Sequence, residues 1–281
     1  LSDRALARAL EGSSSPEATT AMIDLLKTST RQDIVEPLAR GLSRNGNSET
    51  VGALLDLLES SPNPEQRRAI ARALEETNRN ALPQDRLLDL ISRENDSEIA
   101  RNLGRSLERL YPNFVEEHGE SLFQNAEAGP ERAAYARMLS RHGGERAVGT
   151  IADQLAREPD RQAAAEMAHM LGRSDEGIRR AGNIISQTPV RQGENRHSIM
   201  WGLHSGSSSE NPAARNLFLQ IAGSDPSPHM RSQAAEILAH RNDIGVLPQL
   251  EELVSRERDE GARARMQLSI QRLHREAARQ N

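Results

Sequence analysis

The chain contains no cysteine among its 281 residues. This absence excludes disulfide bonds, thiolate metal sites and cysteine nucleophiles. No apolar run approaches the length needed to span a membrane, and no signal peptide is visible. The sequence begins at Leu1 instead of Met, on what we expect to be the second helix of a helical pair. We therefore expect that an upstream signal peptide, anchor, repeat or tag was removed, with the loss of a disordered start as the alternative. The compartment stays open between the bacterial periplasm and the cytoplasm.

Aromatic residues and lysine are also scarce. Aromatic residues make up 2% of the chain, with one Trp, two Tyr and three Phe. So few rings cannot fill an ordinary mixed core, but they suit helical pairs that pack through Ala and Leu. Lys27 is the only lysine among 36 basic residues, which we interpret mainly as the coding bias of a GC-rich bacterial genome. The net charge of −5 does not indicate a surface for nucleic acid over the whole chain.

Two helices joined by a tight turn are predicted at residues 225–257. Asp225 and Pro226 predict the start of the first, because Asp can cap free N–H groups and Pro has no N–H to lose at the first helical position. Apolar residues then recur at helical spacing as far as Leu238, and a second apolar face begins at Ile244. One pair cannot bury these narrow faces alone, so we expect neighbouring pairs of the same kind.

The segment DPSPHMRSQAAEILAH at residues 225–240 resembles the second helix of a HEAT-like repeat. It contains the Asp-Pro turn, an Arg six residues on, and a small-small-x-x-Leu ending. A resemblance of varying strength covers nearly the whole chain. It implies an all-α fold, a right-handed α-solenoid of about eight HEAT-like helical hairpins, in which the Arg-bearing helices line the concave side. The repeat serves many purposes, so the resemblance implies no function.

Helical pairs follow one another at spacings of roughly 30–36 residues, the range expected of helical repeats. We predict a single domain over residues 1–281, with an opening half-repeat at 1–12 and repeats over about 16–278. The longest irregular connection is expected at residues 205–211. The first helices of the pairs are predicted to begin near Glu17, Ser48, Gln84, Asn113, Glu145, Asp175, Pro212 and Ile244. The second helices are predicted to begin near Thr30, Asn63, Asp96, Gly129, Asp160, Val190, Pro226 and Asp259.

HEAT-like helical pairs also form enzymes, and each such family implies residues that can be sought here. The deoxyhypusine hydroxylases hold two irons with paired His-Glu steps, but none of the eight histidines here is followed by Glu. The DNA alkylpurine glycosylases of this architecture surround the lesion with aromatic residues, which are few in this chain. The bilin lyase subunits share the repeat, but no motif singles them out. Gly-rich phosphate loops and nucleophile elbows are absent too. We therefore predict no catalytic residues, no metal, no cofactor and no enzymatic activity.

Arginines recur at two registers of the predicted second helices. The first is the Arg of the repeat, for which the resemblance implies a structural role with turn carboxylates or carbonyls. This register holds Arg67, Arg132, Arg196, Arg231 and Arg263. A second register should face the groove, and residues four apart share a helix face. We predict that it forms a partner-binding stripe of Arg68, Arg72, Arg101, Arg105 and Arg137, with His169 further along. The alternative is a solvated face, neutralised by Glu75, Glu76, Glu98 and Glu108.

The only Trp lies in the predicted helix at residues 196–206. His197, Trp201 and His204 are spaced four and three residues apart, so they share one helix face. The register of Trp201 matches positions that hold Arg or His in neighbouring repeats, and an exposed Trp is costly unless a partner covers it. We predict that all three residues contact a partner, with a gap-filling Trp201 as the alternative. Two histidines seven residues apart make only a weak metal motif without a carboxylate between them.

The function favoured by the sequence is a non-catalytic scaffold that holds an acidic or amphipathic peptide or protein in its concave groove. One alternative is an enzyme subunit of the bilin-lyase type, in which the groove handles a tetrapyrrole with carboxylate arms. The other is nucleic-acid binding along the arginine stripe, which we regard as the weaker. Visible absorbance that co-purifies with the protein would favour the first alternative, and steeply salt-dependent DNA retention would favour the second.

Overall fold

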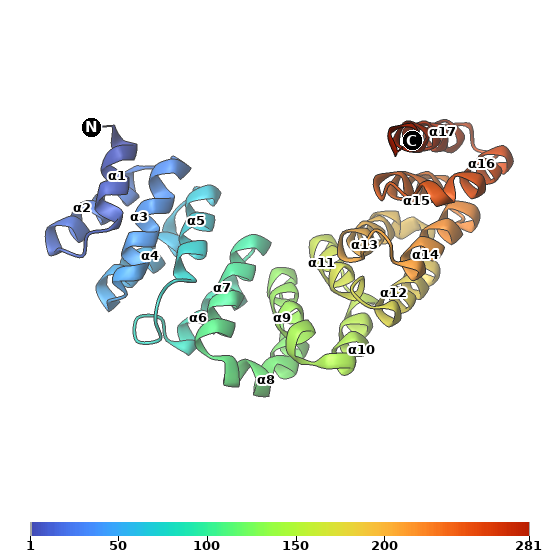
Figure 1. Cartoon of the computed structure of the whole chain (residues 1–281). Helices are drawn as coiled ribbons and strands as arrows, with labels where there is room; N and C mark the ends of the chain where they lie inside the picture. The colour runs from blue at the N-terminus through green and yellow to red at the C-terminus, as the bar shows by residue number, and fades with distance from the viewer. Residues whose placement is uncertain (1, 281) are drawn as a thin grey trace. The chain divides into compact units, whose positions relative to one another are not determined.

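Residues 2–280 are described by a computed structural model, and over this range the chain is built from helices (Figure 1). Helices make up 81% of the chain, with 17 α-helices and no strand between residues 2 and 280. The predicted all-α fold of helical pairs is confirmed. The chain divides into two compact units, residues 1–142 and 143–281, which we describe separately. The assignment of residues 1–281 to a single domain stays a prediction.

The first unit is a lone helix followed by four helical pairs. Its helices are α1 (Asp3–Glu11), α2 (Pro16–Thr28), α3 (Gln32–Asn45), α4 (Ser48–Ser60), α5 (Pro64–Leu74), α6 (Gln84–Arg93), α7 (Ser97–Leu110), α8 (Pro112–Asn125) and α9 (Gly129–His142). Even-numbered helices are the first of each pair and odd-numbered helices the second. Successive second helices pack against one another, α3 on α5, α5 on α7 and α7 on α9.

The second unit contains four more pairs with the same order. Its helices are α10 (Gly144–Leu155), α11 (Arg161–Leu171), α12 (Asp175–Gln187), α13 (Gly193–Gly206), α14 (Pro212–Ser224), α15 (Pro228–His240), α16 (Leu247–Arg256) and α17 (Glu260–Gln280), with short 3₁₀ turns η1 (Val190–Gln192) and η2 (Ile244–Val246). In both units the helices begin within three residues of the predicted starts. Between residues 2 and 280, none of the helices combines the length and the apolar character needed to cross a membrane.

Side-chain caps explain why many of the helices begin where they do. Asn47, Asn63 and Asp160, for example, each accept a hydrogen bond from the backbone N–H three residues on. The start predicted at Pro226, with Asp225 as its cap, lies two residues before the observed start of α15. Ser227 is the N-cap of α15 and Pro228 its first residue, so the carboxylate of Asp225 is left for another partner.

That partner is Arg196, the Arg of the repeat in the preceding pair. Arg196 Nε donates to the carbonyl of Ile185 at 3.0 Å, and its two Nη atoms donate to the two carboxylate oxygens of Asp225. The side chains of Arg196 and Asp225 are only 1% and 5% exposed. Arg196 therefore joins the turn of its own pair to the turn of the next pair.

The same arginine clamp recurs in other pairs. Arg231 donates to both carboxylate oxygens of Glu257 at 2.7 and 2.8 Å and to the carbonyl of Asp225 at 2.7 Å. Arg67 donates to the carbonyl of its own turn at Leu58 and to the Glu94 carboxylate of the next. Two further repeat arginines donate to turn carbonyls, Arg132 to Glu127 and Arg263 to Glu257. The predicted structural role of this register is confirmed.

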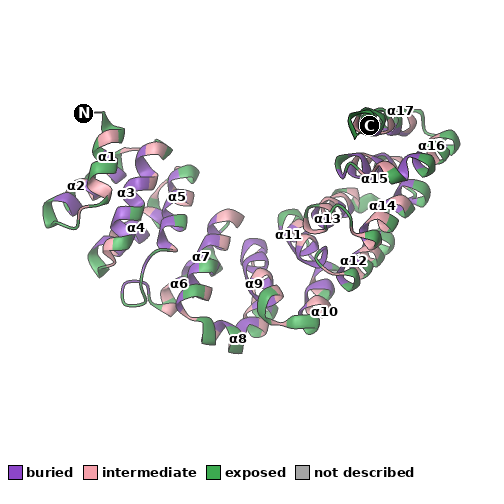
Figure 2. Cartoon of the chain, viewed as in Figure 1, coloured by how far each residue is buried: buried purple, intermediate pink, exposed green. Residues whose placement is uncertain are grey.

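Buried residues, coloured purple in Figure 2, occur along the helices of both units. The leucines near the ends of the second helices, such as Leu42, Leu74 and Leu107, are completely buried. Each contributes about 1.5–3 kcal/mol relative to an exposed side chain. Alanine and leucine are the most frequent residues of this buried core, as the low aromatic content predicts.

Helices α11 and α13 approach each other unusually closely because glycines line their contact. A Cβ atom on Gly202 would lie 2.8 Å from the Cβ of Ala168, and one on Gly206 would lie 2.8 Å from the Cα of His169. Real Cβ atoms essentially never come so close to backbone or packed carbon atoms. The two glycines therefore set the spacing of the helices that carry His169 and Trp201.

The longest irregular connection lies between α5 and α6, not at residues 205–211 as expected. α13 continues to Gly206, whereas residues 75–83 have no regular helix. This connection is tied down by packing: Leu82 is fully buried, and the Leu82 carbonyl accepts a hydrogen bond from Tyr111 Oη at 2.9 Å. The composition of residues 205–211, which is rich in Ser, therefore did not identify the longest irregular connection.

Candidate functional site

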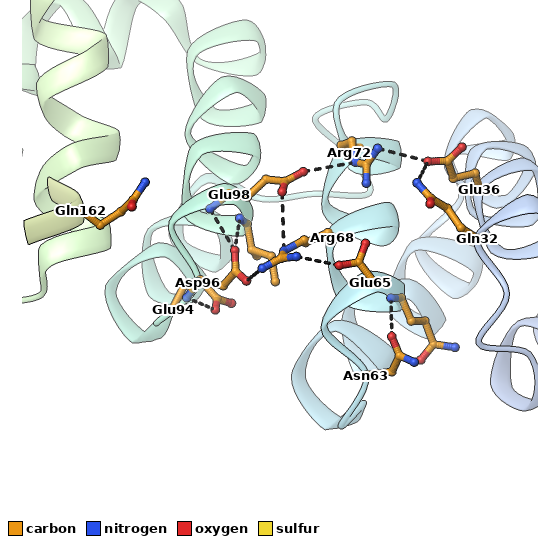
Figure 3. Close-up of polar contacts among 12 residues, drawn as sticks. Gln32, Glu36, Asn63, Glu65, Arg68, Arg72, Glu94, Asp96, Glu98 and Gln162 are labelled. Atoms are coloured by element: carbon orange, nitrogen blue, oxygen red, sulfur yellow. Dashed lines mark hydrogen bonds and ion pairs between the residues drawn. The ribbon is translucent and has the colours of Figure 1, made fainter. Parts of the chain in front are cut away.

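The arginines predicted to form a stripe are all on second helices of the first unit: Arg68 and Arg72 on α5, Arg101 and Arg105 on α7, and Arg137 on α9. Arg68 bridges to the next pair and within its own helix (Figure 3). Its Nη2 lies 2.8 Å from Asp96 Oδ2, and its Nη1 lies 2.7 Å from Glu65 Oε1. The hydrogen bond to Asp96 raises the pKa of Arg68 above its ordinary value. Arg68 is thus engaged by carboxylates of its own chain.

Arg72 and Arg105 are engaged in the same way. Arg72 Nη1 lies 3.1 Å from Glu36 Oε1 of α3, and its Nε lies 3.7 Å from Glu98 Oε1 of α7 (Figure 3). Arg105 Nη1 lies 3.7 Å from Glu75 Oε1 of the preceding pair. Burial raises the pKa of Glu75, while the nearby Arg105 acts in the opposite direction. These exposed pairs contribute at most about 1 kcal/mol each.

Arg101 and Arg137 are half-buried on their helices. Arg68, Arg72 and Arg105 form an ionic network across neighbouring pairs, as the alternative of a neutralised face describes. Two of the four glutamates that were expected to neutralise the stripe, Glu75 and Glu98, take part in this network. A role of these five arginines in binding a partner stays a prediction.

A second group of predicted residues lies on second helices of the second unit. Five of the eight histidines gather there with the only Trp: His169 on α11, His197, Trp201 and His204 on α13, and His229 and His240 on α15. We define the His–Trp surface as His197, Trp201, His204, His229, Gln233 and His240. The predicted sharing of one helix face by the three α13 residues is borne out by their ring contacts, described next.

The rings of the His–Trp surface contact one another across α13 and α15. The ring centroids of Trp201 and His204 lie 5.6 Å apart, edge to face, and those of Trp201 and His240 lie 5.8 Å apart in a similar arrangement. His197 stacks on His229 with centroids 5.6 Å apart and planes 25° from parallel. Edge-to-face and offset-stacked arrangements are the ones that aromatic rings prefer. These contacts hold Trp201 in one orientation.

Gln233 fixes the hydrogen-bonding pattern of this surface. Its Oε1 lies 3.0 Å from Trp201 Nε1 and 3.3 Å from His197 Nε2. An indole N–H can only donate, so Gln233 must present its oxygen to Trp201. It follows that His197 Nε2 also carries a hydrogen, which it donates to the same oxygen. Trp201 is therefore half-buried with its N–H bonded inside the chain, and less exposed than the sequence predicted.

His169 lies on the neighbouring helix α11, one pair before the His–Trp surface. Its Nδ1 is 2.9 Å from the Oγ of Ser205 on α13, and its Nε2 is 3.5 Å from Arg173 Nη2. His169 therefore contributes to the contact between α11 and α13 as well as to the predicted binding register.

Two arginines of α17 extend the His–Trp surface to the next pair. Arg265 Nη1 lies 3.3 Å from His229 Nδ1, and Arg272 Nη1 lies 3.1 Å from His240 Nδ1. Both guanidinium groups belong to exposed residues. An imidazole nitrogen accepts a hydrogen bond only when it carries no proton, so each of these hydrogen bonds requires an unprotonated Nδ1 on the histidine.

Electrostatics favours the neutral imidazole at two positions of this surface, His204 and His229. Burial lowers the pKa of His204, and the nearby Arg241 and His240 lower it further. Burial also lowers the pKa of His229, with His197 and Arg265 acting in the same direction and Glu236 opposing them. At neutral pH these rings therefore offer apolar faces and hydrogen-bonding edges with no charge of their own.

The other candidate sites within residues 2–280, a metal site and a cavity, have less support as a binding site. No group of three or more His, Cys, Asp or Glu side chains in that range is placed to hold a metal ion. A cavity of about 410 Å³ lies between the first helices α12 and α14, lined by Ile178, Gly182 and Leu217 among others. None of the predicted site residues lines it.

Sequence reasoning missed the partners that α15 and α17 contribute. His229, Gln233 and His240 recur at spacings of four and seven residues on one second helix, which places them on one helix face, as the spacings of four and three do on α13. That signal was available. The pairing of Arg265 with His229 was not, because the two residues are 36 positions apart.

Comparison with protein-family profiles and with curated protein sequences gives no match. Among solved structures, human deoxyhypusine hydroxylase in complex with glycerol is similar at 17% identity and a TM-score of 0.33, over 83% of this chain and 88% of the hydroxylase. The complex of CpcE and CpcF of phycocyanin lyase from Nostoc is similar at 16% identity and a TM-score of 0.36, over 78% of this chain and 83% of that one. A designed self-assembling cyclic homooligomer aligns at 12% identity with a TM-score of 0.16, over 99% and 94%.

The hydroxylase and the lyase subunit are HEAT-like helical repeat proteins, as is expected from the fold of this chain. At these identities the likeness concerns the fold alone. The prediction that the chain is not an enzyme is nevertheless contradicted, because these similar structures are an enzyme and an enzyme subunit. The missing His-Glu steps bear on one reaction of one family, and they do not exclude catalysis for the fold in general.

Proposed function

We propose that the chain binds a protein or peptide partner on the His–Trp surface of its second unit. The observation that supports this most directly is Trp201 itself. It is the only Trp of the chain, it remains half-exposed, and its N–H is already satisfied by Gln233. An indole held in this way loses little conformational entropy when a partner covers it, and such residues often dominate binding energy.

The same surface suits a partner of acidic character. The indole and imidazole rings form its centre, and Arg265 and Arg272 of α17 lie beside them. The arginines of the first unit are less suited to start such an interaction, because Arg68 and Arg72 are already paired with carboxylates. We retain the predicted contacts at His169, His197, Trp201 and His204 as part of this proposal. Arg68, Arg72, Arg101, Arg105 and Arg137 remain a predicted extension of it.

The test is a selection of peptides from a displayed random library on immobilised protein. Selected peptides are expected to be rich in Asp and Glu and to contain apolar residues. Trp201→Ala should weaken their binding by about 2 kcal/mol, which is roughly thirtyfold in affinity. The matched control is Leu268→Ala, which removes an apolar side chain that is 62% exposed on α17 of the same unit.

Melting temperatures of both variants separate binding from folding. Trp201 is half-buried, so its loss should lower stability by less than the roughly 3–5 kcal/mol typical of a core Trp. Peptides that bind Trp201→Ala and wild type equally would contradict the proposal. So would a variant that loses binding only because it has unfolded at the assay temperature.

A further inference from the structure

The arginines beside the His–Trp surface have unusual partners. Arg68 and Arg231, like many arginines in the part of the chain that the structure describes, contact carboxylates, whereas Arg173 contacts the imidazole of His169. Within the same described range, Arg265 and Arg272 contact only imidazole nitrogens. A neutral imidazole leaves the full positive charge of the guanidinium uncompensated. Two such charges therefore stand on α17.

These two charges are placed to meet one extended ligand. Arg265 and Arg272 are seven residues apart on α17, so they lie on one helix face about 10 Å apart along the axis. Each contacts the imidazole of a different turn of α15, His229 near its start and His240 at its end. The surface thus presents two equivalent Arg–His pairs.

Each pair is arranged so that a carboxylate could take the place of the Arg–His hydrogen bond. A carboxylate has acceptors only, so it can receive an N–H from the guanidinium together with an N–H from a protonated imidazole. In the free protein, protonating His229 removes the acceptor for Arg265 and places two cations side by side. An arriving carboxylate turns that repulsion into attraction.

We infer that the Arg265–His229 and Arg272–His240 pairs are two proton-linked binding positions for carboxylate side chains of an acidic peptide segment. The inference deepens the proposed function and rests on it, because it assigns the acidic character of the partner to named residues. Binding takes up protons from solvent at the imidazoles, and no covalent bond changes. The affinity therefore increases as the pH falls.

The charged and titratable groups around His229 come from three helices. His197 of α13 stacks on it, Glu236 lies on its own helix α15, and Arg265 of α17 donates to it. Burial, His197 and Arg265 keep the pKa of His229 below its ordinary value, while Glu236 opposes them. A bound carboxylate neutralises Arg265 and so raises the pKa of His229 on binding.

The surroundings of His240 are similar. Glu236 Oε1 lies 3.5 Å from its Nε2, Arg272 donates to its Nδ1, and the rings of Trp201 and His204 pack against it. A rise of one pKa unit on binding corresponds to about a tenfold gain in affinity per histidine. The gain appears as the pH falls through the range in which the imidazole of His229 takes up its proton, and it is lost near pH 4 where aspartate carboxylates take up protons.

The experiment measures binding at constant ionic strength of about 0.15 M, since salt screens exposed charges. Three probes are titrated into the full chain at about pH 8 and about pH 5.5, and Trp201 emission reports binding: an aspartate-rich peptide of about ten residues, the same peptide with Asn in place of Asp, and a single-stranded oligonucleotide of equal length. The acidic peptide is expected to bind at least about tenfold tighter at the lower pH. The neutral peptide should not respond to pH.

Variants assign the effect to the two pairs. His229→Gln and His240→Gln should each remove part of the pH dependence, so that the ratio of the affinities at about pH 5.5 and about pH 8 moves towards one. Arg265→Gln should weaken binding of the acidic peptide at both pH values. The matched controls are Arg275→Gln and His274→Gln, which make the same changes at other exposed positions of α17, where His274 contacts Glu251 of α16. Both controls should behave as wild type.

The outcomes separate this inference from the proposed function. If the acidic peptide binds in a Trp201-dependent way but with the same affinity at both pH values, the proton-linked positions are overturned and the proposed surface stands. If the acidic peptide fails to bind at either pH, both are overturned. Tighter binding of the oligonucleotide than of the peptide at the lower pH would also overturn the assignment to carboxylates.

Discussion

The buried clamp between Arg196 and Asp225 leads to the sharpest stability prediction. Asp225→Ala removes the carboxylate that receives both Nη atoms of Arg196. The guanidinium is then left in a site where the side chain is 1% exposed, with the Ile185 carbonyl as its remaining acceptor. Breaking one side of a buried ion pair costs about 3–5 kcal/mol, because the other charge stays buried without compensation.

Two further variants test whether the cost comes from the stranded charge. Asp225→Asn keeps one acceptor oxygen, in the place of the Oδ1 that Arg196 Nη1 and the N–H of Ser227 share, so we expect an intermediate loss of about 1.5–3 kcal/mol. In the double variant Arg196→Met with Asp225→Leu the charge is gone from both sides. Replacing a buried ion pair with apolar residues often leaves the stability unchanged or increases it, so this double variant should be more stable than Asp225→Ala alone.

Urea denaturation followed by Trp201 emission suits this series, because the only Trp reports on the same unit that holds the clamp. Helical dichroism followed in parallel reports on the whole chain. A loss below about 1 kcal/mol for Asp225→Ala would refute the reasoning. A double variant that is less stable than the single variant would show that the charge pair itself, and not its breaking, stabilises the unit.

Other predictions concern packing, acid sensitivity and the first-unit arginines. Gly206→Ala should lower the free energy of unfolding by about 1–3 kcal/mol or more, because its Cβ would meet the backbone of His169, whereas Gly52→Ala, with open space around it, should raise it by about 0.5–1 kcal/mol. The hydrogen bond from Arg231 lowers the pKa of Glu257 from 4.5 to about 2, so its stabilising contribution is complete above about pH 4.5 and is lost as the pH falls towards 2; Glu257→Gln should flatten acid unfolding in that window. Arg72→Gln should change the free energy of unfolding, measured by urea denaturation, by less than about 1 kcal/mol, because the ion pairs of Arg72 are exposed.

The helical pairs could be predicted from the sequence because their signals are local. Caps such as Asn63 and the apolar spacing of residues three and four apart are both readable within one turn. The role of Arg196 as a structural residue was predicted from its register as well. Its partner was not, because Asp225 was assigned to capping a helix that Ser227 caps instead.

The site could be predicted only in part because its contacts are not local. The face shared by His197, Trp201 and His204 follows from their spacing within α13. The hydrogen bonding of that face depends on Gln233, which comes from the next pair and accepts the N–H of Trp201. Likewise the stripe arginine Arg72 could be placed on its helix, but its pairing with Glu36, 36 residues away, depends on how neighbouring pairs stack.

The arginine clamps also bear on how such a chain can change its length during evolution. Each clamp reaches forward by nearly one pair, from Arg196 to Asp225 over 29 residues and from Arg231 to Glu257 over 26. A deletion of residues 197–231 would place Arg196 in the register of Arg231, facing Glu257. A gene that loses one whole pair in this region thus leaves the clamp arginine with a carboxylate, whereas a cut in the middle of a pair buries a charge without a partner.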